Sequence, residues 1–506
     1  MTTAHMEPGP ATTGLRSWLA LSAAMLGTTV YMLTLTLSGA ALPHMQGAFS
    51  AAPNQMAWVL TTFIIGTAIM TACSGWLALR FGRTRVFAVS TAGFAVASIL
   101  CGLSTTLEEA LVFRTLQGLF GAPLTPLGQA IAIDAFPRRK QGMATAMWSF
   151  GGVAGSAIGP YVGGVLVSEY GWPWVFFVNV PLALLACLAT LLFVPEIVRA
   201  KKSLNWYGFG ALAVAITAFQ LMLNRGERLD WFSDPEIVIE AAIAVLASYL
   251  FAIHIVTSKS PFFPPLLFRD RNYVFGLFLM FVYGAIVFLQ MFLMPVLLQD
   301  LGGYGIEDVG GLLGWRAVGL MFGMLLISPI SDRIDPRIIL VAGFGCLIGS
   351  AWAMSEWTVN IRAFDAAIAM FVQGMGGGIA FVPISMLTFS TVPASTRNDG
   401  MALFFLTSSL GTATGTALIY NVLTRFMRIN HDAMSEVLTP YNELFQQGGM
   451  PRLWSLLQRG GLAAMDAEIG RQAAMIAYNN CFYLIALIGL AALPLTIFVR
   501  FPKPVR

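Results

Sequence analysis

The chain alternates between long apolar runs and short polar links. Each run is about twenty residues long, which is the length an α-helix needs to cross a bilayer. The pattern predicts an all-α polytopic membrane protein with fourteen spans, an even number that places both chain ends on one side. The predicted spans are residues 17–40, 56–78, 84–104, 108–132, 142–168, 173–194, 206–224, 236–257, 272–298, 309–330, 337–355, 363–389, 400–424 and 476–499.

Composition agrees with this prediction. The chain is 57% hydrophobic and 11% charged, whereas soluble globular proteins are about 25% charged. A net charge of +4 is too small to indicate a nucleic-acid partner. The five cysteines fall in apolar runs without paired spacing, and we find no metal-binding cluster, phosphate-binding loop or nucleophile arrangement. We therefore expect neither a cofactor nor an enzyme.

Basic residues are concentrated in the links on the side of the N-terminal tail, residues 1–16. Cytoplasmic loops of membrane proteins carry an excess of Lys and Arg, so both termini are predicted to be cytoplasmic. Two arginines, Arg114 and Arg316, fall inside predicted spans. Asp134 precedes a basic link, and we interpret it as a loop-fixing salt bridge rather than a proton carrier.

The predicted helix 142–168 is rich in glycine. Gly151, Gly155 and Gly159 recur every fourth residue and so form one side, along which another helix backbone can approach closely. Pro160 removes a backbone donor and predicts a bend. We expect this helix to face the C-terminal half and to seal one side of a cavity. The far side of the helix carries Gly163 and Gly164.

Two polar links are alike. GWLALRFGRTR at Gly75–Arg85 follows the second span, and SPISDRIDPR at Ser328–Arg337 follows the tenth. If they are equivalent, a six-span half at 17–200 and another at 261–506 flank two extra helices at 201–260, which is a transporter plan. The gate-loop residues predicted in these links are Gly75, Arg80, Gly82, Arg83, Asp332, Arg333 and Arg337.

The first link resembles the loop motif of the major facilitator superfamily. LVFRTLQGLFGA at 111–122 resembles its fourth-helix motif, and GSAIGPYVGG at 155–164 its antiporter motif. WPWVFFVNVP at 172–181 and QAAMIAYNNCFYLIAL at 472–487 are similar to the fourteen-helix EmrB/QacA group, closest to its EmrB-like branch. The resemblance implies a proton-coupled multidrug antiporter of the bacterial inner membrane. It also implies partnership with a periplasmic adaptor (membrane fusion protein) and an outer-membrane channel.

The resemblance assigns proton coupling and conformational switching to Arg114, to Gln117 on the same helix face, and to the glycine-rich helix. Arg114 lies roughly 10 Å deep at 1.5 Å per residue, where a cation needs a polar cavity or a partner. The alternative is that it extends outward toward Glu108 or water. For Arg316, binding of an anionic substrate group and pairing with Glu307 or Asp308 both remain open.

The chain departs from the group at residues that would carry protons. The group usually has an acid in the first helix where this chain has Thr34, and often Tyr-Asn-Asp where this chain has Tyr478-Asn479-Asn480. Three functions therefore stay open. They are a proton-coupled exporter of lipophilic compounds, an uncoupled or differently coupled permease or facilitator, and a non-transporting sensor with the same fold.

The substrate path is predicted only by class. Methionines give soft, adaptable surfaces, and the two arginines favour neutral or weakly anionic lipophiles. We expect residues 425–475, a long extracytoplasmic loop, to form short amphipathic helices that contact an adaptor or membrane lipids. The predicted cavity residues are Met25, Tyr31, Met32, Thr34, Gln290, Met291, Met294 and Arg316.

Overall fold

The computed structural model describes residues 14–51, 53–137, 140–196, 204–226, 229–258, 260–327, 334–393, 396–437 and 459–498, and every regular element in these ranges is a helix. Twelve of the described helices are long and apolar enough to cross a membrane. The main elements are α1 (Leu15–Phe49), α2 (Pro53–Phe81), α3 (Arg83–Leu103), α4 (Leu107–Gly121), α5 (Leu124–Asp134), α6 (Gln141–Tyr170), α7 (Trp174–Phe177), α8 (Asn179–Phe193), α9 (Trp206–Arg225), α10 (Pro235–Thr257), α11 (Pro265–Arg269), α12 (Arg271–Val296), α13 (Ile306–Ile327), α14 (Pro336–Met354), α15 (Ala363–Phe389), α16 (Arg397–Val437), α18 (Arg459–Ala492) and α19 (Leu495–Phe498).

The predicted span 108–132 is divided into α4 and α5. The break falls at Ala122 and Pro123, which cap the two helices. Proline lacks the backbone donor of a continuous helix, and its ring clashes with the preceding turn. The helices α4, α5 and α6 are not among these twelve candidate spans. Nearly every residue of α5 is buried, so this short helix lies in the interior of the bundle.

The two halves repeat one packing pattern. In the N-terminal half α1 packs against α6, α2 against α4, and α3 against α8 and α4. In the C-terminal half α12 packs against α16, α13 against α15, and α14 against α18 and α15. Helices one and five, two and four, and three and six of each half are therefore neighbours. This agreement supports the equivalence of the two polar links from which the repeat was predicted.

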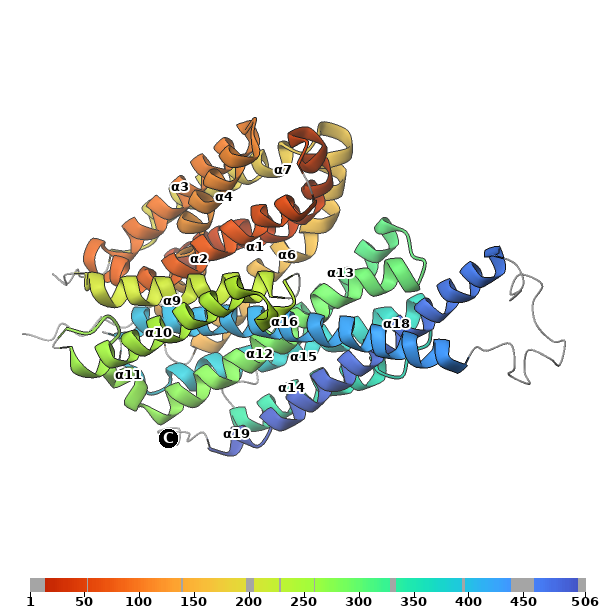
Figure 1. Cartoon of the computed structure of the whole chain (residues 1–506). Coiled ribbons are helices and arrows are strands. Elements are labelled where there is room, and N and C mark those ends of the chain that lie inside the picture. The colour runs from red at the N-terminus through yellow and green to blue at the C-terminus, as the bar shows by residue number, and fades with distance from the viewer. Residues whose placement is uncertain are drawn as a thin grey trace, which may run out of the picture.

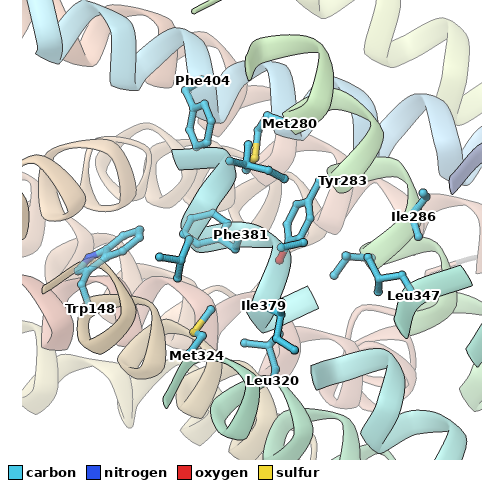
Figure 2. Packing of buried hydrophobic residues seen from close by; sticks show 14 of the residues in the cluster. Trp148, Met280, Tyr283, Ile286, Leu320, Met324, Leu347, Ile379, Phe381 and Phe404 are labelled. Carbon is cyan, nitrogen blue, oxygen red and sulfur yellow. The ribbon is translucent and has the colours of Figure 1, made fainter. Parts of the chain in front are cut away.

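The halves contact each other through corresponding helices. α2 packs against α16, and α6 packs against α13. In Figure 1 the two sets of helices run close together near α9 and separate toward the ends that carry α7 and α13. One buried apolar cluster includes residues of both halves, and Figure 2 shows Trp148 of the N-terminal half pointing toward Phe381 of α15.

The pair α9 and α10 covers one seam between the halves. α9 packs against α10 and α2 and also contacts α16. Its Leu212 and Ile216 join a buried apolar cluster with Ala68 of α2 and Leu406 of α16. The extra helices therefore touch both halves rather than only linking them.

The region 425–475 is more helical than expected. α16 continues to Val437, and α18 begins at Arg459, so both helices extend past the predicted span ends at 424 and 476. Figure 1 shows these extensions projecting beyond the bundle. His431 of α16 contacts Asp466 of α18 at 3.0 Å, which ties the two extensions together.

Candidate functional site

Arg114 of α4 is completely buried, with 0% of its surface exposed. Its Nη1 donates to Gln117 Oε1 at 2.6 Å and its Nε donates to the Val59 carbonyl oxygen of α2 at 3.2 Å. Among the described residues no carboxylate forms a salt bridge with it. The alternative that Arg114 extends toward Glu108 or water is therefore wrong, because its guanidinium is held inside the protein.

Phe63 of α2 connects Arg114 to a second predicted residue. The Arg114 guanidinium carbon lies 4.5 Å from the centre of the Phe63 ring, a cation–π contact that gains strength when it is desolvated. The Phe63 ring also stacks on the ring of Tyr31 of α1, a predicted cavity residue, with centroids 6.0 Å apart. Sequence reasoning missed Phe63, since an aromatic residue in an apolar span carries no distinguishing signal.

Gln117 extends the polar network to α3. Its Nε2 donates to Ser98 Oγ at 2.8 Å, while its Oε1 accepts from Arg114. The structure thus confirms the predicted contact between Arg114 and Gln117, three residues apart on one helix face. The network leaves one atom unsatisfied, because Arg114 Nη2 has no hydrogen-bond partner among the described residues.

Arg316 of α13 occupies a corresponding site in the C-terminal half. Its Nε donates to Gln373 Oε1 of α15 at 2.7 Å, and its Nη2 donates to the Val287 carbonyl oxygen of α12 at 3.1 Å. Arg316 is half-buried. Gln373 was not among the predicted residues, although a glutamine in an apolar span is a visible signal.

Asp134, at the end of α5, joins the halves. It accepts from Arg83 of α3 at 2.7 Å and from Arg397 of α16 at 2.6 Å. We call these three residues the latch, and the end of the bundle that carries them the latch end. The interpretation of Asp134 as a salt-bridge residue is confirmed, but the prediction did not include its partner Arg397.

Gly75 of α2 lies directly against the start of α16. A Cβ atom at Gly75 would be 2.5 Å from Asp399 Oδ1 and 2.7 Å from Asp399 Cα. Asp399 is 2% exposed. Only glycine fits this contact between the halves. The buried acid Asp399 was not among the predicted residues.

The remaining predicted gate residues are spread over both links. Gly82 forms the one-residue turn between α2 and α3 with φ +94°, a conformation that favours glycine. Arg80 is exposed, and the Arg337 backbone N–H donates to Asp335 at the start of α14. Asp332 and Arg333 lie outside the described residues.

α6 faces the C-terminal half through its packing against α13, as expected, but its glycine side lies against α1. A Cβ at Gly155 would be 2.5 Å from the Thr29 carbonyl oxygen, and one at Gly159 would overlap Thr36 Oγ1. A Cβ at Gly164 would meet nothing within 4 Å, and Gly163 is buried. α6 is helical through position 160, but the Pro160 side chain lies outside the described part of the chain.

The predicted cavity residues do not gather in one place. On α1, Tyr31 and Thr34 are buried while Met25 and Met32 are half-buried; Thr34 donates to the Val30 carbonyl oxygen of its own helix at 2.8 Å. On α12, Gln290 and Met294 are 0% exposed. Gln290 Nε2 lies 3.9 Å from the Met354 sulfur of α14, inside the C-terminal half. The Met291 side chain is outside the described set.

Comparison with known proteins agrees with this arrangement. The model of the family described as Major Facilitator Superfamily matches residues 24–416. The probable multidrug resistance protein EmrY of Escherichia coli is 31% identical, over 98% of this chain and 97% of that protein. The multidrug export protein EmrB of Haemophilus influenzae is 32% identical over 96% and 95%, and the fatty acid resistance protein FarB of Neisseria gonorrhoeae 28% identical over 95% and 95%.

Proposed function

The chain belongs to the major facilitator superfamily, and from this premise we propose that it exports lipophilic small molecules by alternating access. The observation that carries the proposal is the contact between the halves. The latch and the Gly75–Asp399 contact hold the two halves together at one end, while Figure 1 shows them separating at the other. A transporter that rocks between two states closes one end at a time. Relatives named as multidrug export and resistance proteins support the direction of transport.

We place the latch end on the cytoplasmic side of a bacterial inner membrane, with fourteen spans and both termini cytoplasmic. The excess of basic residues in the links on this side supports the orientation. The twelve candidate spans, together with α6 and the α4–α5 pair, supply fourteen membrane crossings. The tied extensions of α16 and α18 then project outward, where a periplasmic adaptor linked to an outer-membrane channel would dock.

Proton coupling is the leading proposal for the driving force, through Arg114 and the network around it. A buried cation without a carboxylate partner among the described residues is sensitive to any charge that enters its surroundings. Thr34 supports a second candidate, an uncoupled or differently coupled permease. Its hydroxyl, at the position of the group's usual acid, is bonded to its own helix.

Transport into inverted membrane vesicles tests these proposals. A fluorescent lipophilic weak acid is supplied outside, with and without an imposed pH gradient that is acidic inside the vesicle. Uptake that needs the gradient supports the proton-coupled exporter, and uptake that ignores it supports the permease. No uptake above that of vesicles carrying the Arg114→Gln variant would contradict both. A neutral lipophile and a quaternary cation, run in parallel, test the proposed substrate class.

A further inference from the structure

A buried hydrogen bond joins the two halves deep inside the protein. Gln129 Nε2 of α5 donates to Ser385 Oγ of α15 at 2.8 Å, and the two residues are 256 positions apart. Gln129 is 0% exposed and Ser385 is 2% exposed. Gln129 lies five residues before the latch residue Asp134, or about 7 Å along the helix axis. The bond is therefore a further contact between the halves, separate from the latch.

The two partners occupy equivalent positions of the repeat. The spacing of 256 residues also separates Gln117 from Gln373, and each of these glutamines accepts from the arginine inside its own half. Gln129 and Ser385 are thus matching residues of the two fourth helices. Matching residues that touch each other lie on the pseudo-two-fold axis that relates the halves, where both halves must part for a passage to open.

The surroundings of this bond are polar but incompletely paired. Gln129 Oε1, Thr125 Oγ1 and Ser149 Oγ have no hydrogen-bond partner among the described residues, although all three atoms are buried. Thr125 lies one turn before Gln129 on the same face of α5, and Ser149 belongs to α6, which packs against α5. An unpaired buried polar group costs roughly 1–3 kcal/mol. Such unpaired groups on α5 and α6 are costly while the halves are together, and they gain partners once water enters.

We propose that Gln129 and Ser385 form the closing joint of the passage between the halves, and that Thr125 and Ser149 line this passage when the latch end opens. The joint rests on the proposed alternating access. One hydrogen bond and the Trp148–Phe405 ring contact, with centroids 5.9 Å apart, favour the closed arrangement, while the unpaired groups favour the open one. The opposing contributions keep the two states close in free energy, as a transporter that must visit both requires.

The test measures how often the passage opens. Ser149→Cys replaces the hydroxyl by a thiol of similar size, and N-ethylmaleimide, which crosses membranes, labels it from either side. Labelling of Cys at position 149 is quantified by peptide mass spectrometry, which separates it from the five native cysteines. Each further substitution is made in this background, and detergent gel filtration checks that the protein is folded.

If the joint closes the passage, the single and the double substitution should change the labelling rate in opposite directions. Ser385→Ala leaves both the Nε2 and the Oε1 of the Gln129 amide unpaired in the closed state, so labelling should become roughly 5–30 times faster. Adding Gln129→Leu to Ser385→Ala makes the contact apolar, and labelling should become slower than in the parent. Ser385→Thr keeps the hydroxyl and should restore the parent rate. Ser350→Ala is the matched control, because Ser350 is equally buried and its hydroxyl donates to the Leu347 carbonyl oxygen of its own helix.

Equal rates in Ser385→Ala and the double variant would overturn the joint, and so would an unlabelled thiol in Ser385→Ala. The labelling needs neither substrate nor pH gradient, so its outcome is independent of the transport assay. Opposite shifts in a protein that does not transport would refute the proposed function and leave the joint standing. Transport with unshifted labelling would refute the joint alone.

Discussion

Each half contains an arginine that donates to a glutamine, but the two arginines lie on different helices. In each half a glutamine of the fourth helix, Gln117 or Gln373, accepts from an arginine guanidinium. In the N-terminal half the arginine, Arg114, lies on that same fourth helix, whereas Arg316 of the C-terminal half lies on the second helix. The glutamine is the shared element, and the cation has changed its place.

The helix contacts show how the exchange is possible. A Cβ at Gly118 would press on the Phe63 carbonyl, and one at Gly374 would press on the Arg316 carbonyl. Phe63 and Arg316 therefore occupy corresponding places on the second helices. In one half this place holds a ring that stacks on the arginine, and in the other it holds the arginine itself. Close helix packing at glycine is preserved while the polar chemistry differs.

The two arginines also differ in how deeply they are buried. Arg114 is fully buried, and its hydrogen bonds to one backbone carbonyl and one side-chain amide leave part of the guanidinium unpaired. Arg316 is half-buried. A charge that is fully desolvated depends more strongly on each partner. We therefore expect the N-terminal site to be the more sensitive of the two.

The largest effect is expected for Arg114→Gln. The substitution removes the charge and leaves the Val59 carbonyl oxygen and Gln117 Oε1 without their donor, so transport should fall by about a hundredfold. Substrate uptake in vesicles measures this, normalised to the amount of folded protein. Arg316→Gln is the matched variant, and a loss as large as that of Arg114→Gln would contradict the unequal roles.

The next effect concerns the packing of one half. Gly159→Leu forces a side chain into Thr36 of α1 and should destabilise the N-terminal half by about 1–3 kcal/mol. Thermal unfolding followed in detergent gives the measurement. Gly164→Leu on the same helix is the control, since a Cβ there meets nothing within 4 Å. Equal midpoints for the two variants would show that α1 and α6 do not need the glycine contact.

A smaller effect is expected at the latch. Asp134→Asn removes both ion pairs that join Arg83 to Arg397, but the carboxylate is partly exposed and solvent weakens such pairs. Maleimide labelling of the native Cys73, which is 4% exposed, should become several times faster as the latch end opens. Asp365→Asn, which removes the exposed pair with Arg362, should leave the rate unchanged.

The last prediction compares the two arginine sites directly. Lysine keeps the charge but lacks the planar fork that serves two acceptors at once. Arg114→Lys should lower transport roughly tenfold, whereas Arg316→Lys should lower it only two- to threefold. The ratio of the two losses, measured with one substrate in parallel vesicle preparations, reports how unequal the sites are. A ratio near one would indicate that both halves use their arginine in the same way.

Much of the architecture follows from the sequence because hydrophobic periodicity and length define spans locally. The contact between Arg114 and Gln117 was also predictable, since residues three apart share a helix face. The partner of the glycine stripe was not, because spacing defines a face without saying which helix lies on it. Arg397 was missed as the partner of Asp134 for a similar reason: the two are 263 residues apart, and only the assembled halves bring them together.

The break at Pro123 divides the fourth helix between two tasks. α4 holds Arg114, while α5 carries both Gln129 and the latch residue Asp134. The equivalent C-terminal helix α15 contains Pro383 but remains continuous. The fourth helix of the N-terminal half is therefore interrupted where its counterpart is continuous, and the interruption separates the arginine pocket from the residues that join the halves.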